Sequence, residues 1–139
     1  MTLRPFHLAI AVDDLKRAEA FYGGLIGCPQ GRRSEHWIDF NFFGHQLVTH
    51  LSPEDCAQAA TNDIDGKNVP VRHFGVVLEK NDWQALAKKL TEAGVEFIIE
   101  PGVRFEGKPG EQGTFFLKDP AGNALEFKYF HDDAQIFAT

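Results

Sequence analysis

The stretch FHLAIAVDDL at residues 6–15 is echoed later in the chain by RHFGVVL at residues 72–78. The two histidines, His7 and His73, match at an offset of 66 positions. Each copy is an apolar run of strand length that leads into a helical pattern. An internal repeat of this kind predicts two similar structural modules.

Alternation along a β-strand sorts the side chains of each copy onto two faces. One face carries the larger apolar residues of the strand. The other face carries the histidine with smaller neighbours: His7, Ala9 and Ala11 in the first copy, and His73, Gly75 and Val77 in the second. A ligand therefore has room beside each histidine.

The first module continues with a helix and a strand hairpin. Apolar residues recur at helical spacing from Leu15 to Leu25, and glycines at 23, 24 and 27 end the run. Residues 28–36 are polar and read as a turn. Residues 37–43 and 46–51 read as strands joined at Gly44 and His45.

The second module repeats this order after a connection at residues 52–70, in which 56–60 is expected to form a short helix. Apolar residues at helical spacing predict a helix through Trp83 and Leu90, with Asn81 and Gln84 resembling a capping box. Strands are expected at 95–100, 114–117 and 124–130. The glycine-rich segment 101–113 is expected to be irregular and long enough to act as a lid.

Composition and charge exclude several classes of partner. The chain has 139 residues, 43% of them hydrophobic and 24% charged, which is typical of one globular domain. Its net charge of −6 without a basic run argues against nucleic acid or an anionic membrane as partner. Two cysteines form no disulfide framework, and no leader or membrane span is apparent, so the cytoplasm is the expected compartment.

The most informative single residue is Glu126, a carboxylate in mid-strand between Leu125 and Phe127. Such a position is costly unless the group meets water, a cation or a metal. If the two modules curl together, His7, His73 and Glu126 converge on one concave surface. Two imidazoles and one carboxylate form the facial arrangement that suits Fe(II) and related metals.

The paired modules resemble the vicinal oxygen chelate superfamily, which includes glyoxalases, bleomycin-resistance proteins, epimerases and extradiol dioxygenases. The resemblance covers about residues 5–130. It is carried by the two repeat histidines and by DPAGNALE at residues 119–126, which resembles the family's DPxGNxxE ending. It implies an α+β fold of paired βαβββ modules forming a curled mixed sheet, with module one at 1–66 and module two at 67–139.

The resemblance also implies that His7, His73 and Glu126 bind a divalent metal, and that the substrate chelates this metal through adjacent oxygens. Glyoxalase-like members have a fourth protein ligand on the strand that closes the first module. Aligning the two closing strands on Gly44 and Gly122 places Val48 there, and valine cannot ligate. Gln46 and His50 lie on the same face two residues to either side, so a two-residue shift in the alignment would restore a fourth ligand.

A three-ligand site is similar to that of the small dioxygenase branch, with Fe(II) as the cofactor. Glyoxalase-like lyase or epimerase chemistry with Zn, Mn, Ni or Co, and metal-free sequestration of a ligand, are the alternatives. His50 is the candidate for proton transfer. The candidate substrate-binding residues are Gln46, Arg104 and Phe116. The expected partners are a small-molecule substrate and a second copy of the chain in a homodimer.

Overall fold

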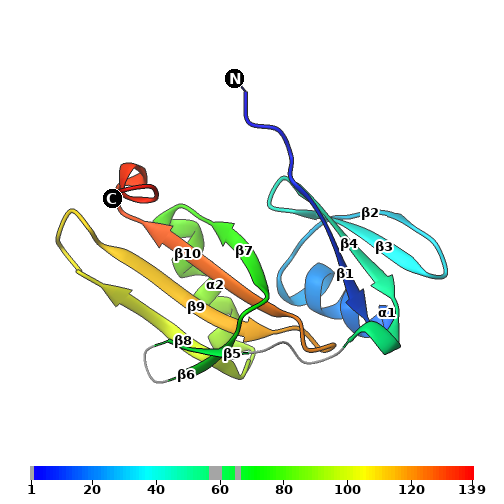
Figure 1. Cartoon of the computed structure of the whole chain (residues 1–139). Helices are drawn as coiled ribbons and strands as arrows, with labels where there is room; N and C mark the ends of the chain where they lie inside the picture. The colour runs from blue at the N-terminus through cyan, green and yellow to red at the C-terminus, as the bar shows by residue number, and fades with distance from the viewer. Residues whose placement is uncertain (1, 57–60, 65–66) are drawn as a thin grey trace. The chain divides into compact units, whose positions relative to one another are not determined.

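The computed structural model describes residues 2–56, 61–64 and 67–139 (Figure 1). The chain divides into two compact units. The first comprises Met1–Gln58 with Asp119–Asn123, and the second comprises Ala59–Lys118 with Ala124–Thr139. No helix in the described part of the chain is long and apolar enough to cross a membrane.

The first unit holds a four-stranded mixed sheet with the strand order β1-β4-β3-β2. Strand β1 (His7–Val12) pairs in parallel with β4 (His45–Leu51), whereas β3 (Trp37–Phe42) and β2 (Gln30–Arg33) continue the sheet antiparallel. Helix α1 (Leu15–Ala18) runs directly into a π-helical segment, Glu19–Leu25. A 3₁₀ turn at Pro53–Asp55 follows β4.

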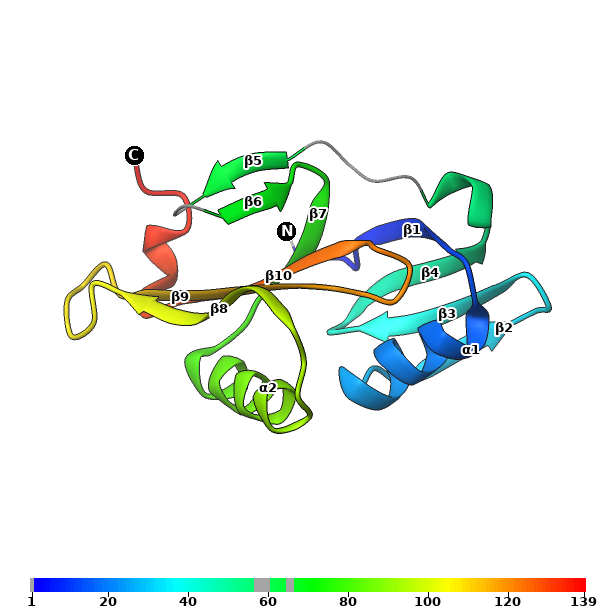
Figure 2. The same cartoon turned by 90° about the horizontal axis from the view of Figure 1, so that it is seen from below.

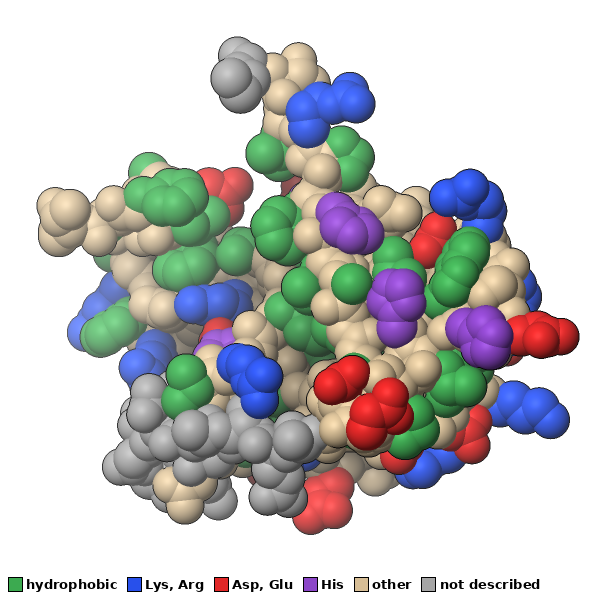
Figure 3. All heavy atoms as spheres, turned by 45° about the vertical axis from the view of Figure 1, so that its right-hand side comes forward, with side chains coloured by type: hydrophobic (Ala, Val, Ile, Leu, Met, Phe, Trp, Pro, Cys, Tyr) green, Lys and Arg blue, Asp and Glu red, His purple; other side chains and the backbone are tan. Residues whose placement is uncertain are grey.

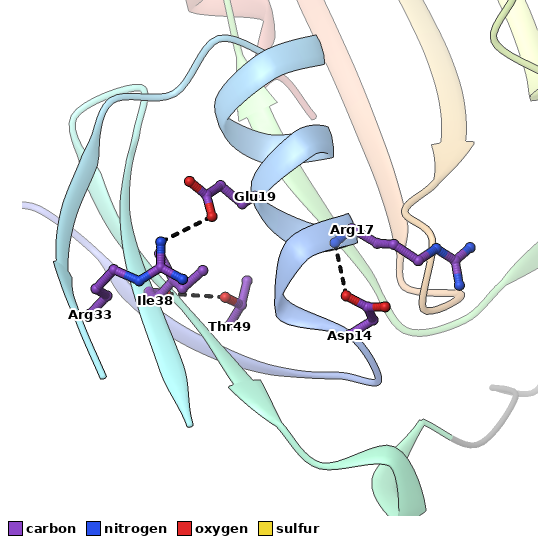
Figure 4. A network of polar contacts seen from close by, with 6 residues as sticks. All are labelled: Asp14, Arg17, Glu19, Arg33, Ile38 and Thr49. Carbon is purple, nitrogen blue, oxygen red and sulfur yellow. Dashed lines mark hydrogen bonds and ion pairs between the residues drawn. The ribbon is translucent and has the colours of Figure 1, made fainter. Parts of the chain in front are cut away.

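Local chemistry fixes the helix of the first unit and its packing. Asp14 caps α1 by accepting a hydrogen bond from the backbone N–H of Arg17 at 3.1 Å (Figure 4). Tyr22 is fully buried, and its ring lies 5.6 Å from that of Phe40 on β3. Arg33 of β2 forms an ion pair with Glu19 at 3.0 Å. The same close-up shows this contact. The helical segment therefore covers one face of the sheet and leaves the other to the side chains of His7 and its neighbours.

A turn from late in the sequence also belongs to the first unit. The carboxylate of Asp119 accepts four hydrogen bonds, from the Tyr22 hydroxyl at 2.7 Å and from three N–H groups of Ala121 and Asn123. The Asn123 amide also donates to the carbonyl of Ala11 at 2.8 Å. Burial, followed by the charge of Asp119, raises the pKa of Tyr22 well above its ordinary value. This network gives the Asp119-to-Asn123 part of the terminal motif a structural role.

The second unit repeats the order with the strands β7-β10-β9-β8. Strand β7 (His73–Val77) pairs in parallel with β10 (Ala124–Phe130), and β9 (Gln112–Lys118) and β8 (Phe97–Arg104) continue antiparallel. A separate two-stranded hairpin, β5 (Thr61–Ile64) with β6 (Lys67–Pro70), precedes β7, and a 3₁₀ turn at Asp133–Gln135 follows β10. Two mixed sheets with few helices confirm the predicted α+β fold class of repeated βαβββ modules.

Helix α2 (Lys80–Glu92) covers one face of the second sheet, as Figures 1 and 2 both show. Trp83 anchors it: the indole N–H donates to the carbonyl of Phe127 at 2.9 Å, and the ring meets that of Tyr129 edge-on at 4.9 Å. The buried residues that complete this layer are Leu86, Ala87, Leu90, Phe115, Leu117 and Leu125. The core thus occupies the face opposite to the one that carries His73.

Several expectations about secondary structure were wrong. Residues 30–33 form β2 instead of a turn, and the connection contains the β5–β6 hairpin. The capping residue of α2 is Glu79, not Asn81. Strand β8 continues to Arg104 and β9 begins at Gln112, because register shifts along β8 accommodate Pro101 and Gly102 within the pairing. The short helix expected at 56–60 falls largely outside the described residues.

The loop between β8 and β9 is therefore shorter than predicted, and Glu111 holds it. The Glu111 carboxylate accepts hydrogen bonds from the backbone N–H of Gly107 at 2.9 Å and from the Tyr129 hydroxyl at 3.0 Å. It also forms an ion pair with Lys80 at 2.8 Å. These donors lower the pKa of Glu111 to about 2, with the backbone hydrogen bond as the largest cause and the Lys80 contact next. A segment tied in this way is anchored, contrary to the expectation of a loose lid.

Replacing Glu111 with glutamine should destabilise the protein in a pH-dependent manner. The ordinary pKa of 4.5 falls to about 2 on folding, so the ionised carboxylate favours the folded state above pH 4.5. That contribution is lost as the pH falls from 4.5 towards 2. Urea unfolding at a series of pH values should show the difference between parent and Glu111→Gln shrinking in this window. A difference that stays constant with pH would contradict this role of Glu111. The matched control is Glu92→Gln, which removes a carboxylate from the exposed ion pair between Lys88 and Glu92.

Candidate functional site

The register of the two inner strand pairs is the same in both units. His7 of β1 lies opposite Gln46 of β4, and His73 of β7 lies opposite Ala124 of β10. The residue two positions further along the closing strand is Val48 in the first unit and Glu126 in the second. The structure therefore supports the alignment that equates Val48 with Glu126, and it gives no sign of a two-residue shift.

Gly75 allows the close approach of the two strands that carry His73 and Glu126. A Cβ atom at Gly75 would collide with the backbone carbonyl of Glu126. The matching position in the first unit is Ala9, which lies opposite Val48. Because only glycine fits at residue 75, this position controls where the backbone of Glu126 lies.

The imidazole of His73 is oriented by two contacts. Its Nδ1 lies 2.8 Å from the carbonyl oxygen of Pro70, an acceptor only, so Nδ1 must carry the proton in this contact. The ring also meets Phe116 edge-on at 5.1 Å, and Phe116 is buried. These contacts leave Nε2 without its proton in the neutral ring, ready to act as a ligand.

The carboxylate of Glu126 is oriented in the same manner. Its Oε2 accepts a hydrogen bond from the Thr114 hydroxyl at 2.6 Å, and its Oε1 lies 3.7 Å from Nε2 of His73. The Glu126 side chain is only 16% exposed. Among the described residues no lysine or arginine forms an ion pair with it. A carboxylate this sheltered and without a permanent cation favours a cation as its ligand.

His73 and Glu126 fit a shared metal ion. Their facing atoms are too far apart for a hydrogen bond, at 3.7 Å. Bonds of about 2.1 Å from each atom to one divalent ion would span up to about 4 Å. The atoms that face away from each other, Nδ1 of His73 and Oε2 of Glu126, already contact Pro70 and Thr114. Metal-binding side chains usually have such a second partner, which fixes their orientation. The donor types and their orientation thus suit a divalent metal.

A cleft in the second unit contains this pair. Its volume is about 350 Å³, and all its lining residues come from the second unit. Phe116 and Arg104, both predicted to bind substrate, line it together with His73 and Glu126. Arg104 lies at the end of β8 rather than on a mobile loop. The structure therefore brings together four of the residues that the sequence singled out.

The other predicted residues lie in the first unit. His7 Nδ1 lies 3.0 Å from the Oε1 atom of Gln46, an arrangement that mirrors the contact between His73 and Pro70. Gln46 is therefore placed to orient His7, while its predicted role in substrate binding stays a prediction. His50 lies on the same sheet face, between Ala11 and Trp37, and is exposed. Histidine side chains are open to solvent on the face that Figure 3 shows.

The described residues contain no complete three-donor centre. Within residues 2–56, 61–64 and 67–139, no group of three or more histidine, cysteine, aspartate or glutamate residues is placed to hold a metal. His73 and Glu126 lie in the second unit, whereas His7 lies in the first. The role of these three residues as a common ligand set stays a prediction.

Sequence reasoning did not identify Thr114 and Pro70, which help to orient the pair. On β9, Thr114 lies opposite Lys128 and Phe116 lies opposite Glu126. Thr114 and Phe116 are two positions apart and share one face of the sheet, so strand alternation alone could have identified Thr114 as a neighbour of Glu126. Pro70 had no such signal, because its role depends on a backbone carbonyl in the segment before β7. Lys128, two residues past Glu126 on the same face, also lines the cleft.

The chain matches known proteins over nearly its whole length. Residues 4–127 match the family model of the Glyoxalase/Bleomycin resistance protein/Dioxygenase superfamily. A glyoxalase/bleomycin resistance protein/dioxygenase from Alicyclobacillus acidocaldarius is 39% identical, with 96% of each chain covered and a TM-score of 0.76. No curated protein matches the chain.

Two more distant structures share the fold. Lactoylglutathione lyase from Agrobacterium tumefaciens is 19% identical, with 96% of each chain covered and a TM-score of 0.65. The fosfomycin resistance protein FosX from Listeria monocytogenes is 14% identical, covers 97% of this chain and 99% of its own, and has a TM-score of 0.69. At these identities the likeness concerns the fold alone.

The orientation of the two repeat histidines predicts their tautomers. In the neutral state His73 and His7 should both carry the proton on Nδ1, because each Nδ1 donates to an oxygen. Two-bond ¹H–¹⁵N correlation spectra above pH 8 distinguish the two tautomers. The exposed His36 serves as the control without such a partner oxygen on Nδ1. Protonation of His73 on Nε2 instead would contradict the orientation described here.

Proposed function

The chain belongs to the glyoxalase/bleomycin resistance protein/dioxygenase superfamily, and we propose that it is a metal-dependent enzyme of the extradiol dioxygenase type. The observation that carries the proposal is the oriented pair of His73 Nε2 and Glu126 Oε1, with valine at the matching position of the other unit. The metal would be held by His7, His73 and Glu126, and Fe(II) is the ion that this donor set suits.

Val48 is the reason to favour three protein ligands. Its side chain is buried and contains no donor atom. A site with three protein donors leaves open positions for a substrate that chelates through two adjacent oxygens and for a further small molecule. A fourth protein ligand, as in glyoxalase-like members of the superfamily, would occupy one of these positions.

The residues of the chain would bind and orient the substrate. When bound, the metal supplies charge stabilisation and a common anchor for the two substrate oxygens. Phe116 forms an apolar wall beside His73 and restricts the plane in which a ring can lie. Thr114 keeps Oε2 of Glu126 occupied, so that Oε1 stays directed at His73. His50 would take a proton from a substrate hydroxyl and return it to the product.

Metal content tests the ligand set. Protein loaded with Fe(II) or Zn(II) and desalted should retain about one ion per chain. Glu126→Gln and His73→Ala should each reduce the affinity by tenfold or more, while Glu100→Gln and His36→Ala should not. The affinity should fall at acidic pH, because imidazoles must be neutral to ligate. Unchanged metal content in both site variants would end the proposal.

Oxygen consumption tests the reaction. Fe(II)-loaded protein prepared without air should consume dissolved oxygen when mixed with a 1,2-dihydroxybenzene, and a ring-opened product should appear in equal amount. Turnover of a test substrate without oxygen uptake would instead assign the site to the lyase or epimerase type. Tight binding of the compound by metal-free protein without turnover would indicate sequestration.

A further inference from the structure

The cleft of the second unit has a cationic end beside the metal pair. Lys128 lies on β10 two residues past Glu126, on the same face of the sheet, with Val77 and Thr114 as its neighbours on the adjacent strands. It is half-buried and lines the cleft. Its ammonium group makes no ion pair within the described residues and stands 5.6 Å from the centre of the Phe130 ring.

The next row of the sheet adds a second cation. Arg104 of β8 lies opposite Gln112 of β9, and Gln112 lies opposite Phe130 of β10. Successive same-face rows are about 7 Å apart along a strand. Moving away from Glu126, the face therefore presents first Lys128 with Thr114, and then Gln112 with Arg104.

The charges that line the cleft favour an anion once a metal is bound. The lining contains two cations, Lys128 and Arg104, and two carboxylates, Glu126 and Glu100. Glu126 is directed at His73, and Glu100 is exposed on the outer strand, where solvent screens it. A divalent ion beside Glu126 would leave the cleft with a net positive charge, and the cationic end would then attract a negative group.

We propose that Lys128, with Arg104 in the next row, binds a carboxylate of the substrate. The substrate is then a small acid whose carboxylate lies about 7 Å from the adjacent oxygens that chelate the metal, since one row of the sheet separates Lys128 from Glu126. The cleft volume of about 350 Å³ suits a single ring with a short acidic substituent. This inference rests on the proposed function for the position of the chelating oxygens.

A pair of probes separates the carboxylate from the chelating oxygens. 3,4-Dihydroxybenzoate carries both, whereas 1,2-dihydroxybenzene carries only the oxygens. Titration calorimetry measures the binding of each probe to the full-length protein, with Zn(II) bound as a redox-inert ion and again after the metal is removed. The parent protein should bind the acid at least tenfold more tightly than the neutral probe, because a charge-assisted contact is made only with the acid.

The Lys128→Met variant should lose this preference and bind the neutral probe within twofold of the parent. Lys128→Arg should retain most of the preference. The matched control is Lys118→Met, which removes a lysine from the same sheet face outside the cleft lining. Equal binding of the two probes by the parent protein would overturn the inference, as would a preference for the acid that survives in Lys128→Met.

The metal arm keeps this test distinct from that of the proposed function. If removal of Zn(II) leaves the affinity for 1,2-dihydroxybenzene unchanged, the chelation proposal fails. The preference for the acid in metal-free protein still reports on Lys128, because the ammonium group acts on the carboxylate directly. If the parent protein binds both probes equally while removal of Zn(II) still weakens their binding, the carboxylate site alone is rejected.

Discussion

The parallel pairing of β7 with β10 is the constraint on which the candidate site depends. It places His73 opposite Ala124 and Glu126 opposite Gly75, so the imidazole and the carboxylate lie on one face in adjacent rows. The absence of a side chain at Gly75 permits this pairing, since a Cβ atom there would collide with the backbone of Glu126. A one-residue slip would turn Glu126 towards the core, where its charge would have no partner.

The two units carry different side chains on one scaffold. Their strand order and inner register are identical, and each histidine has its Nδ1 held by an oxygen. The next pair along the same sheet face differs between the units. Ala9 and Val48 are both apolar, whereas Gly75 lets the backbone of Glu126 come close and Glu126 supplies a carboxylate. A repeated fold therefore positions equivalent atoms, and single side chains decide that one unit carries a carboxylate where the other carries an apolar residue.

Sequence alternation predicted the faces of the inner strands because a strand period of two leaves no freedom once one side is buried. The prediction therefore placed His73 and Glu126 on the correct face. It failed at β8, where proline and glycine indicate a loop but register shifts accommodate them at an outer strand. It also missed Pro70, whose carbonyl orients His73, because a backbone acceptor in a connection has no side-chain signature. Glu111 was interpreted as one charge in a loose loop, although its contacts with Lys80 and Tyr129 anchor that loop.

Anomalous diffraction from a crystal soaked with Co(II), recorded above and below the cobalt absorption edge, would show whether His73 and Glu126 share a metal ion. We expect one strong peak within about 2.2 Å of both Nε2 of His73 and Oε1 of Glu126, with an imidazole nitrogen of His7 as the third protein ligand. A cobalt peak bound elsewhere, or a direct contact between His73 and Glu126 with no ion between them, would contradict this expectation.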